Sequence, residues 1–174
     1  MTFLEYLMTV DDSHPMTTDR RHIADVCELC EGSTGSILEL GSHAGISTAA
    51  IAMASPSAKV ISVDLCDTVP EEARVEYWAG LGIRNITPSS VSAGMYLAGM
   101  SSVGGWFDVI FHDACHGESV LGEYVLASSM CGRLAIHDYE QLSPSSQKRI
   151  ESFFARIDRS KDAKGRELFR GWNE

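Results

Sequence analysis

Apolar and polar positions along the chain follow a helical period in some segments and form continuous apolar runs, typical of buried strands, in others. The apolar runs predict strands at residues 36–40, 59–64, 83–87, 107–111 and 133–137. Segments between them predict helices over residues 46–54, 93–100 and 116–130. Strands therefore alternate with helices along the chain.

Three more helices are predicted from signals at their ends. Thr17 or Thr18 caps a helix that precedes the first strand, and Thr68 forms a capping box with Glu71 at the start of a helix that runs to residue 80. A last helix begins at residues 143–144, where Pro follows Ser. Its apolar residues at core spacing are Ile150, Phe153, Phe154 and Ile157.

This alternation predicts an α/β fold made of βαβ units: a Rossmann-like, doubly wound and mostly parallel sheet with helices on both faces. Residues 159–174 leave room for one short strand pair at most. The length of 174 residues suits one domain. We find no repeat, linker or low-complexity tract, so a single domain over residues 1–174 is expected.

The charge balance and the apolar runs bear on partners and location. A formal net charge of −10 repels phosphate backbones and anionic lipid, so neither nucleic acid nor a membrane is an expected partner. No run approaches the roughly 18 uninterrupted apolar residues of a membrane span, and residues 1–10 lack the basic flank of a signal peptide. An odd number of cysteines, five, fits a reducing cytoplasm, so a cytoplasmic protein is expected.

Acids and histidines follow four of the predicted strands. Because ligands bind at the carboxyl ends of strands in an open parallel sheet, these residues are the strongest functional signal in the chain. Buried charge is costly unless it is paired or used. The strand-end residues are Glu39, Gly41, Ser42, His43, Gly45, Asp64, Asp113, His116, His137 and Asp138.

The loop after the first strand indicates the class of cofactor. A dinucleotide site favours G-x-G-x-x-G, whose second glycine lets the backbone approach a pyrophosphate. Here His43 takes the place of that glycine, between Gly41 and Gly45. This suits a ligand without phosphate, such as S-adenosylmethionine (SAM), whose charged amino-acid end can meet Glu39 and the loop amides. Asp64, at the end of the second strand, is placed to accept hydrogen bonds from ribose hydroxyls.

Four segments resemble the class I SAM-dependent methyltransferases, and most closely their small O-methyltransferase branch with macrocin-type and cephalosporin-hydroxylase-like members. The segments are ELGSHAGIST (39–48), ISVDLCD (61–67), FDVIFHDACH (107–116) and LAIHDY (134–139). The resemblance implies a sheet of about seven strands, with Gly41, Ser42 and Gly45 along the methionine part of SAM. It also implies that Asp64 holds the ribose and that Ser90 lies by the adenine.

The same branch often binds magnesium through an acid after the fourth strand and an acidic pair after the fifth, and uses a D-x-x-H histidine as general base. The resemblance thus implies a metal site at Asp113, His137 and Asp138, with Asp113 and His116 as catalytic residues. A histidine ordinarily titrates near pH 6.5 and can take a proton from a hydroxyl at neutral pH. However, His137 stands where the branch has an acid, and magnesium prefers oxygen ligands. Manganese, or no metal, remains open.

Other interpretations stay open at this point. His137 and Asp138 could pair with each other, and His116 could cap a helix or lie at the surface. The chain could be a methyltransferase acting on a hydroxyl of a small-molecule acceptor, a non-catalytic SAM-binding module, or a NAD-dependent oxidoreductase, which His43 disfavours. A core this small either leaves the acceptor site open or closes it with a second subunit, so a homodimer is plausible.

Overall fold

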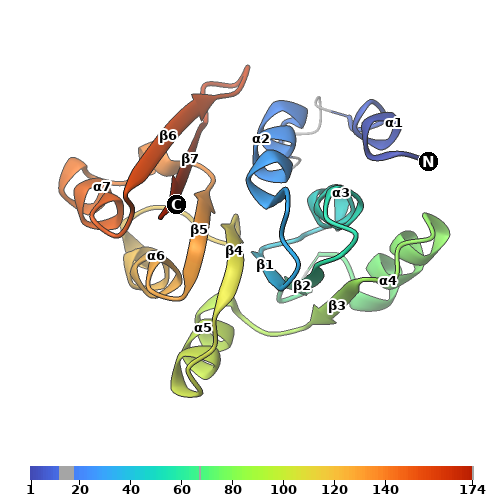
Figure 1. The fold of residues 1–174 in the computed structure, drawn as a ribbon, viewed down its shortest axis with the longest axis horizontal. Coiled ribbons are helices and arrows are strands. Elements are labelled where there is room, and N and C mark those ends of the chain that lie inside the picture. The colour runs from blue at the N-terminus through green and yellow to red at the C-terminus, as the bar shows by residue number, and fades with distance from the viewer. Residues whose placement is uncertain (12–17, 67, 174) are drawn as a thin grey trace.

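The computed structural model describes residues 1–11, 18–66 and 68–173, and its centre is one seven-stranded sheet. The strand order is β3-β2-β1-β4-β5-β7-β6 (Figure 1). The strands are β1 (Ser36–Leu40), β2 (Lys59–Val63), β3 (Ile86–Ser89), β4 (Phe107–His112), β5 (Cys131–Ile136), β6 (Arg156–Lys161) and β7 (Glu167–Trp172).

Strands β1 to β5 are mutually parallel, and β7 pairs antiparallel with both β5 and β6. Chain order reverses between β1 and β4, which is the switch point where α/β sheets bind ligands. The predicted α/β, mostly parallel, doubly wound sheet is therefore confirmed, and the strand pair expected within residues 159–174 is the β6–β7 hairpin, which begins earlier, at Arg156.

Helices cover both faces of the sheet. One apolar cluster joins the sheet to α1–α4, and a second joins it to α5–α7 (Figure 1). Neighbouring residues of a strand point to opposite faces, so Ile37 packs in the first cluster and Leu38 in the second. The helices are α1 (Phe3–Leu7), α2 (Arg20–Cys30), α3 (Ile46–Ala54), α4 (Glu71–Gly80), α5 (Ala93–Ser102), α6 (Leu121–Ser128) and α7 (Pro144–Glu151).

Two predicted helix caps are wrong. The carboxylate of Asp19, one residue beyond Thr18, accepts the backbone N–H of Arg21 and caps α2; Thr17 lies outside the described residues. The hydroxyl of Thr18 donates to Asp113 instead. Helix α4 begins after Pro70, with no side chain as a cap, so the predicted capping box of Thr68 and Glu71 does not form.

Three element boundaries also differ from the prediction. Strand β3 begins three residues later than expected, at Ile86. A 3₁₀ turn (η1, Glu118–Val120) precedes α6. Helix α7 ends at Glu151, so Ile157 lies on β6 and is exposed rather than in the core. The chain leaves α7 and pairs as β6 with β7 at the edge of the sheet, which satisfies the backbone groups of this segment.

The longest described helix, α2, has 11 residues, about half of the roughly 20 that cross a bilayer. No helix in the described ranges could therefore span a membrane.

Candidate functional site

A cleft of about 570 Å³ opens at the carboxyl ends of the parallel strands. Its volume lies within the range of roughly 300–1,000 Å³ found for small-molecule sites. The loops after β1, β2, β4 and β5 all reach it. Its polar and titratable lining residues are Thr18, His43, Asp64, Thr68, Ser92, Asp113, Cys115, His116, Glu123, His137, Asp138 and Arg166, and Gly41 also lines it.

The loop after β1 requires glycine at both predicted positions. Gly41 has φ +89°, and a Cβ there would overlap the backbone of Ala114 at the end of β4. Gly45 has φ +77°, and a Cβ there would lie 2.6 Å from Nε1 of Trp78, which donates to the Gly45 carbonyl. Left-handed backbone and close contact both exclude a side chain. Gly41 lines the cleft, whereas Gly45 turns the chain into α3 behind it.

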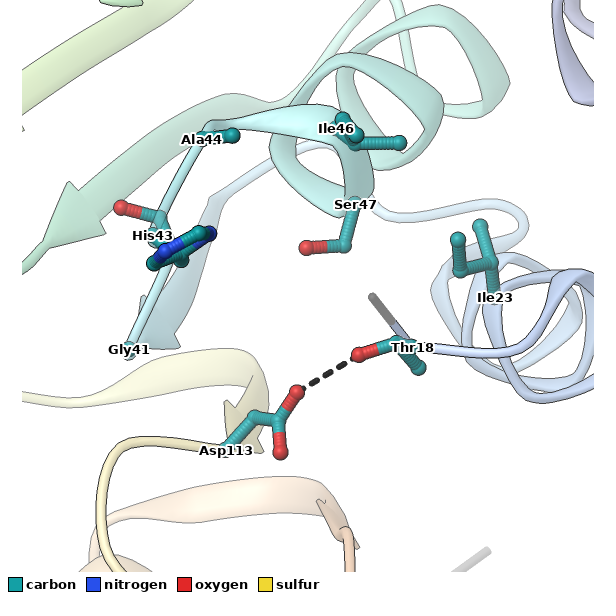
Figure 2. Close-up of a pocket in the computed structure, with 9 residues that line it drawn as sticks. Thr18, Ile23, Gly41, His43, Ala44, Ile46, Ser47 and Asp113 are labelled. Atoms are coloured by element: carbon teal, nitrogen blue, oxygen red, sulfur yellow. Dashed lines mark hydrogen bonds between the residues drawn. The ribbon is translucent and has the colours of Figure 1, made fainter. Parts of the chain in front are cut away.

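A small hollow of about 30 Å³ lies between this loop and the segment before α2. Figure 2 shows the hydroxyl of Thr18 bonded to the carboxylate of Asp113, with Ser47 and His43 on the other side of the hollow. The Thr18–Asp113 distance is 2.7 Å. The hollow and the cleft share Thr18, Gly41, His43 and Asp113, so they form one continuous site.

Asp64 follows β2 and lines the cleft as predicted. Its Oδ2 accepts the backbone N–H of His43, and its Oδ1 accepts that of Cys66, each at 2.8 Å. These bonds fix the carboxylate in place. Each oxygen keeps a second lone pair that can accept from a ligand hydroxyl.

Glu39 lies under the loop rather than in the cleft. Its side chain is fully buried and accepts hydrogen bonds from the hydroxyls of Ser47, at 2.5 Å, and Thr48, both on α3. Burial raises the pKa of Glu39 to about 7, although these two hydrogen bonds act in the opposite direction. Glu39 thus ties β1 to the start of α3, and direct contact with a ligand stays a prediction.

Arg74 supports the same loops, and sequence analysis missed it. Its guanidinium is fully buried on α4 and donates to the hydroxyl of Ser42 and, at 2.6 Å, to the thiol of Cys66. It also lies 5.9 Å from the ring of Trp78. The spacing of Arg74 and Trp78, one helical turn apart, is the signal that could have placed both on one buried face.

On the adenine side of the predicted site, the serine that lines the cleft is not the predicted one. Ser90 is exposed, and its hydroxyl bonds to Glu71. Ser92, two residues along, lines the cleft together with Ala93 and Leu65. A role for Ser90 stays a prediction, and Ser92 is the serine placed at the cleft.

Asp113, His116, His137 and Asp138 come together at the ends of β4 and β5. Nδ1 of His137 lies 2.9 Å from Oδ1 of Asp113 and 3.5 Å from Oδ1 of Asp138. Nε2 of His116 lies 3.8 Å from Asp113 and 3.6 Å from Asp138. The structure therefore gathers all four predicted catalytic and metal residues.

The electrostatics of this group favour an ionised Asp113. Burial raises the pKa of Asp113, but hydrogen bonds from His137 and Thr18 and the charge of His137 outweigh it, so the pKa lies below its ordinary value. Burial lowers the pKa of His137, but its bond to Asp113 and the charges of both aspartates outweigh burial and raise it. Because an ionised carboxylate only accepts, His137 must donate through Nδ1.

The predicted metal set does not fit this geometry. Nδ1 of His137 turns a donor N–H, not a lone pair, toward the two carboxylates, so this nitrogen cannot ligate an ion bound between them. Asp113 accepts from His137 through one oxygen and from Thr18 through the other. The alternative weighed from the sequence paired His137 with Asp138; that contact is 3.5 Å long, and the shorter contact of His137 is to Asp113.

No protein-family model and no curated protein sequence matches the chain. Solved structures do match it. The precorrin-6y C5,15-methyltransferase of Geobacter metallireducens superposes with a TM-score of 0.70 at 9% identity, over 96% of this chain and 99% of that one. A candidate O-methyltransferase of Klebsiella pneumoniae gives 0.61 at 18% identity, over 99% and 88% of the two chains.

A candidate SAM-dependent methyltransferase of Streptococcus mutans gives a TM-score of 0.64 at 15% identity, over 84% of this chain. The chain spans about half the length of that protein, 47%. At such low identities these likenesses establish the fold alone. The chain has the Rossmann-like fold of SAM-dependent methyltransferases of known structure.

Proposed function

We propose that the cleft binds SAM and that the protein transfers the methyl group of SAM to a hydroxyl of a small molecule. One observation carries this proposal: the glycine turn after β1 and the carboxylate of Asp64 after β2 face the same cleft at the switch point of the sheet. Ribose hydroxyls would donate to Asp64, and the amino-acid part of the cofactor would lie along Gly41, Ser42 and His43 toward the hollow beside Thr18.

The charges of the cleft favour SAM over a dinucleotide. Four carboxylates line it, those of Asp64, Asp113, Glu123 and Asp138. They attract a sulfonium cation and repel a pyrophosphate. The His43 ring also lines the cleft, at the position where a dinucleotide site has a glycine. The NAD-dependent alternative is therefore disfavoured on two independent grounds.

The methyl transfer itself needs a base close to the acceptor oxygen. The imidazole of His116 takes the proton of the acceptor hydroxyl, through the ring nitrogen that holds its lone pair, as the oxygen attacks the methyl carbon of SAM. The C–S bond breaks, its electron pair stays on sulfur, and S-adenosylhomocysteine (SAH) leaves. Asp113 and Asp138, both within 4 Å of Nε2 of His116, stabilise the imidazolium until its proton passes to water. This step depends mainly on positioning, and we derive no step through a metal.

Two features support the proposed class of acceptor: the net charge of the chain and the base that lines the cleft. The net charge of −10 disfavours a nucleic-acid acceptor, and His116 is a base suited to a hydroxyl. The fold does not select the acceptor, because loops change while the sheet is retained. A small hydroxylated molecule is therefore the acceptor that we propose.

The test is transfer of labelled methyl from SAM to a panel of catechols, sugars and hydroxy acids, with a structured RNA as an additional acceptor and with a chelator present or absent. Transfer to a hydroxyl that is lost in His116→Asn supports the proposal. Tight SAH binding with no transfer to any acceptor would support the binding-module alternative instead. Transfer to the RNA alone would contradict the small-molecule class.

A further inference from the structure

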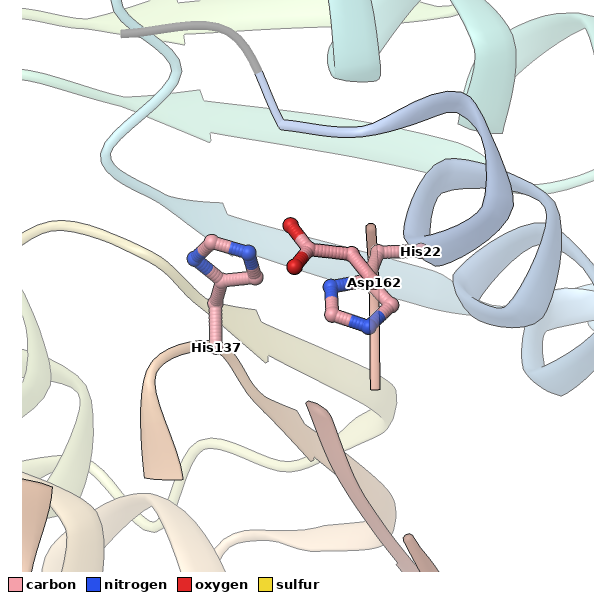
Figure 3. Close-up of side chains that lie close together, drawn as sticks. All are labelled: His22, His137 and Asp162. Atoms are coloured by element: carbon pink, nitrogen blue, oxygen red, sulfur yellow. The ribbon is translucent and has the colours of Figure 1, made fainter. Parts of the chain in front are cut away.

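Two histidines and one aspartate from distant segments lie together behind the cleft. His22 is in the first turn of α2, His137 follows β5, and Asp162 follows β6. One potential donor atom from each lies within 4.8 Å of those of the other two, and all three residues are buried. Figure 3 shows the carboxylate of Asp162 beside both rings. Within the described ranges, this is the set of three His, Cys, Asp or Glu side chains that meets this distance condition.

The ring nitrogens at this place lack hydrogen-bond partners. His22 is 0% exposed, and neither of its nitrogens has a partner; Nε2 of His137, a residue 2% exposed, has none either. Leaving a buried polar atom unpaired is costly. Each neutral ring offers one lone pair, and two such rings next to a carboxylate indicate a ligand that accepts lone pairs.

His137 is oriented as a metal ligand normally is. Its Nδ1–H donates to Asp113 at 2.9 Å, which leaves the lone pair of the neutral ring on Nε2, the nitrogen that has no partner. Metal-ligating histidines almost always donate their other N–H to a carboxylate or carbonyl, which fixes the tautomer and the ring. Asp113 is thus an outer partner of this site rather than a ligand.

Asp162 is held in place by its own loop. Its Oδ1 accepts the backbone N–H groups of Lys164 and Arg166, and its Oδ2 accepts from Nε of Arg166 at 2.6 Å. Oδ2 keeps a lone pair for a further contact. Ligating carboxylates are commonly hydrogen-bonded in this way.

We infer that His22, His137 and Asp162 form a binding site for a divalent transition-metal ion of the zinc class. Imidazole nitrogen suits zinc and its neighbours, whereas magnesium prefers oxygen. Zinc bonds of about 2.0–2.2 Å place tetrahedral ligand atoms about 3.3–3.6 Å apart, so the three side chains need to draw together by at most about 1.5 Å. A water from the cleft can complete the coordination, since His137 and Arg166 also line the cleft.

Such an ion would cross-link three parts of the fold that lie far apart in the sequence. It would link α2, the end of β5 and the β6–β7 hairpin, and it would hold the N–H of His137 on Asp113. The inference does not depend on methyl transfer, because no donor atom of the site is needed to bind SAM.

The site is tested by zinc binding to the full chain. The protein is stripped with a chelator and titrated with zinc in competition with a chromophoric chelator, and bound zinc is counted by mass spectrometry after desalting. We expect one zinc per chain. His22→Phe and Asp162→Asn are expected to weaken zinc binding at least about 100-fold, more than the roughly 10–100-fold that loss of an outer partner such as Asp113 costs.

Asp108→Asn is the control, since Asp108 accepts the backbone N–H of Gly35 at the opposite end of the sheet and should leave the zinc affinity unchanged. His22→Phe keeps a planar ring without unpaired nitrogens, and circular dichroism checks that it folds. Absence of zinc from the unaltered chain, zinc retained by both ligand variants, or equal loss in Asp108→Asn would each overturn the inference. SAH binding is unaffected by any of these outcomes, so they do not bear on the proposed function.

Discussion

Nδ1 of His137 donates to Oδ1 of Asp113 across 2.9 Å, and this contact joins the end of β5 to the end of β4 under the cleft. Thr18, from the segment before α2, donates to the other oxygen of Asp113. The carboxylate near His116 is therefore held by two donors from distant parts of the chain. In the proposed reaction, Asp113 would keep its position while His116 acts on the acceptor.

His116→Asn should abolish most turnover while SAH still binds. A general base contributes typically 10²–10⁴-fold to rate, so kcat should fall by about that factor. SAH affinity should change less than about threefold, because in our proposal His116 faces the acceptor. Steady-state kinetics on the best acceptor, with calorimetry of SAH, make the comparison. Unchanged kcat would remove His116 from the mechanism.

Gly45→Ala should destabilise the protein more than Gly82→Ala. Both glycines have φ +77°, so both substitutions carry the cost of left-handed backbone, roughly 1–2 kcal/mol. A Cβ at Gly45 would also meet the ring of Trp78 at 2.6 Å, whereas nothing lies within 4 Å of one at Gly82. Overpacking adds about 1–3 kcal/mol, and denaturant unfolding measures the difference. Equal free energies of unfolding would mean that the Trp78 contact is not tight.

Glu39→Gln should remove a pH dependence of stability. Burial raises the pKa of Glu39 from 4.5 to about 7, so between these values the folded protein binds a proton that the unfolded chain lacks. Stability contributed by Glu39 is therefore full below about pH 4.5 and is lost as pH rises through about 7. The total corresponds to roughly 3 kcal/mol.

The measurement for Glu39 is the free energy of unfolding of both proteins from about pH 5 to about pH 8. Because other groups titrate in both proteins, the difference between the two curves isolates Glu39. The free energy of unfolding of Glu39→Gln, relative to that of the unaltered protein, should therefore increase as pH rises. A constant difference would show that Glu39 is ionised throughout.

Local patterns in the sequence were sufficient for the sheet and for part of the site. Continuous apolar runs identified the parallel strands, and the rule that ligands bind at their carboxyl ends selected Gly41, Asp64 and Asp113, all of which line the cleft. The cap at Thr18 was wrong because a tertiary contact competed: Thr18 bonds to Asp113, which lies 95 residues away. The cap at Thr68 was wrong because α4 begins later, after Pro70.

Features that depend on long-range packing could not be predicted. Arg74 supports the loop after β1 from a neighbouring helix; its spacing from Trp78 indicates a buried face, but nothing near it in the sequence specifies the contact with Ser42. The group of His22, His137 and Asp162 draws on three segments far apart in the chain. Only the right position of α2 and of the hairpin brings them together.

The central claim is that Asp64 accepts hydrogen bonds from the ribose of an adenosyl cofactor in the cleft. Calorimetric titration with SAH tests this claim most directly. Asp64→Asn keeps the shape but removes the charge, and loss of hydrogen bonds to a charged group, about 1.5–3 kcal/mol, should weaken binding roughly 10- to 150-fold. Asp108→Asn is the control, since that acid accepts the backbone N–H of Gly35 at the opposite end of the sheet. We predict one SAH per chain, weakened in Asp64→Asn and unchanged in Asp108→Asn; absence of binding to the unaltered protein, or equal affinity in all three, would contradict the account.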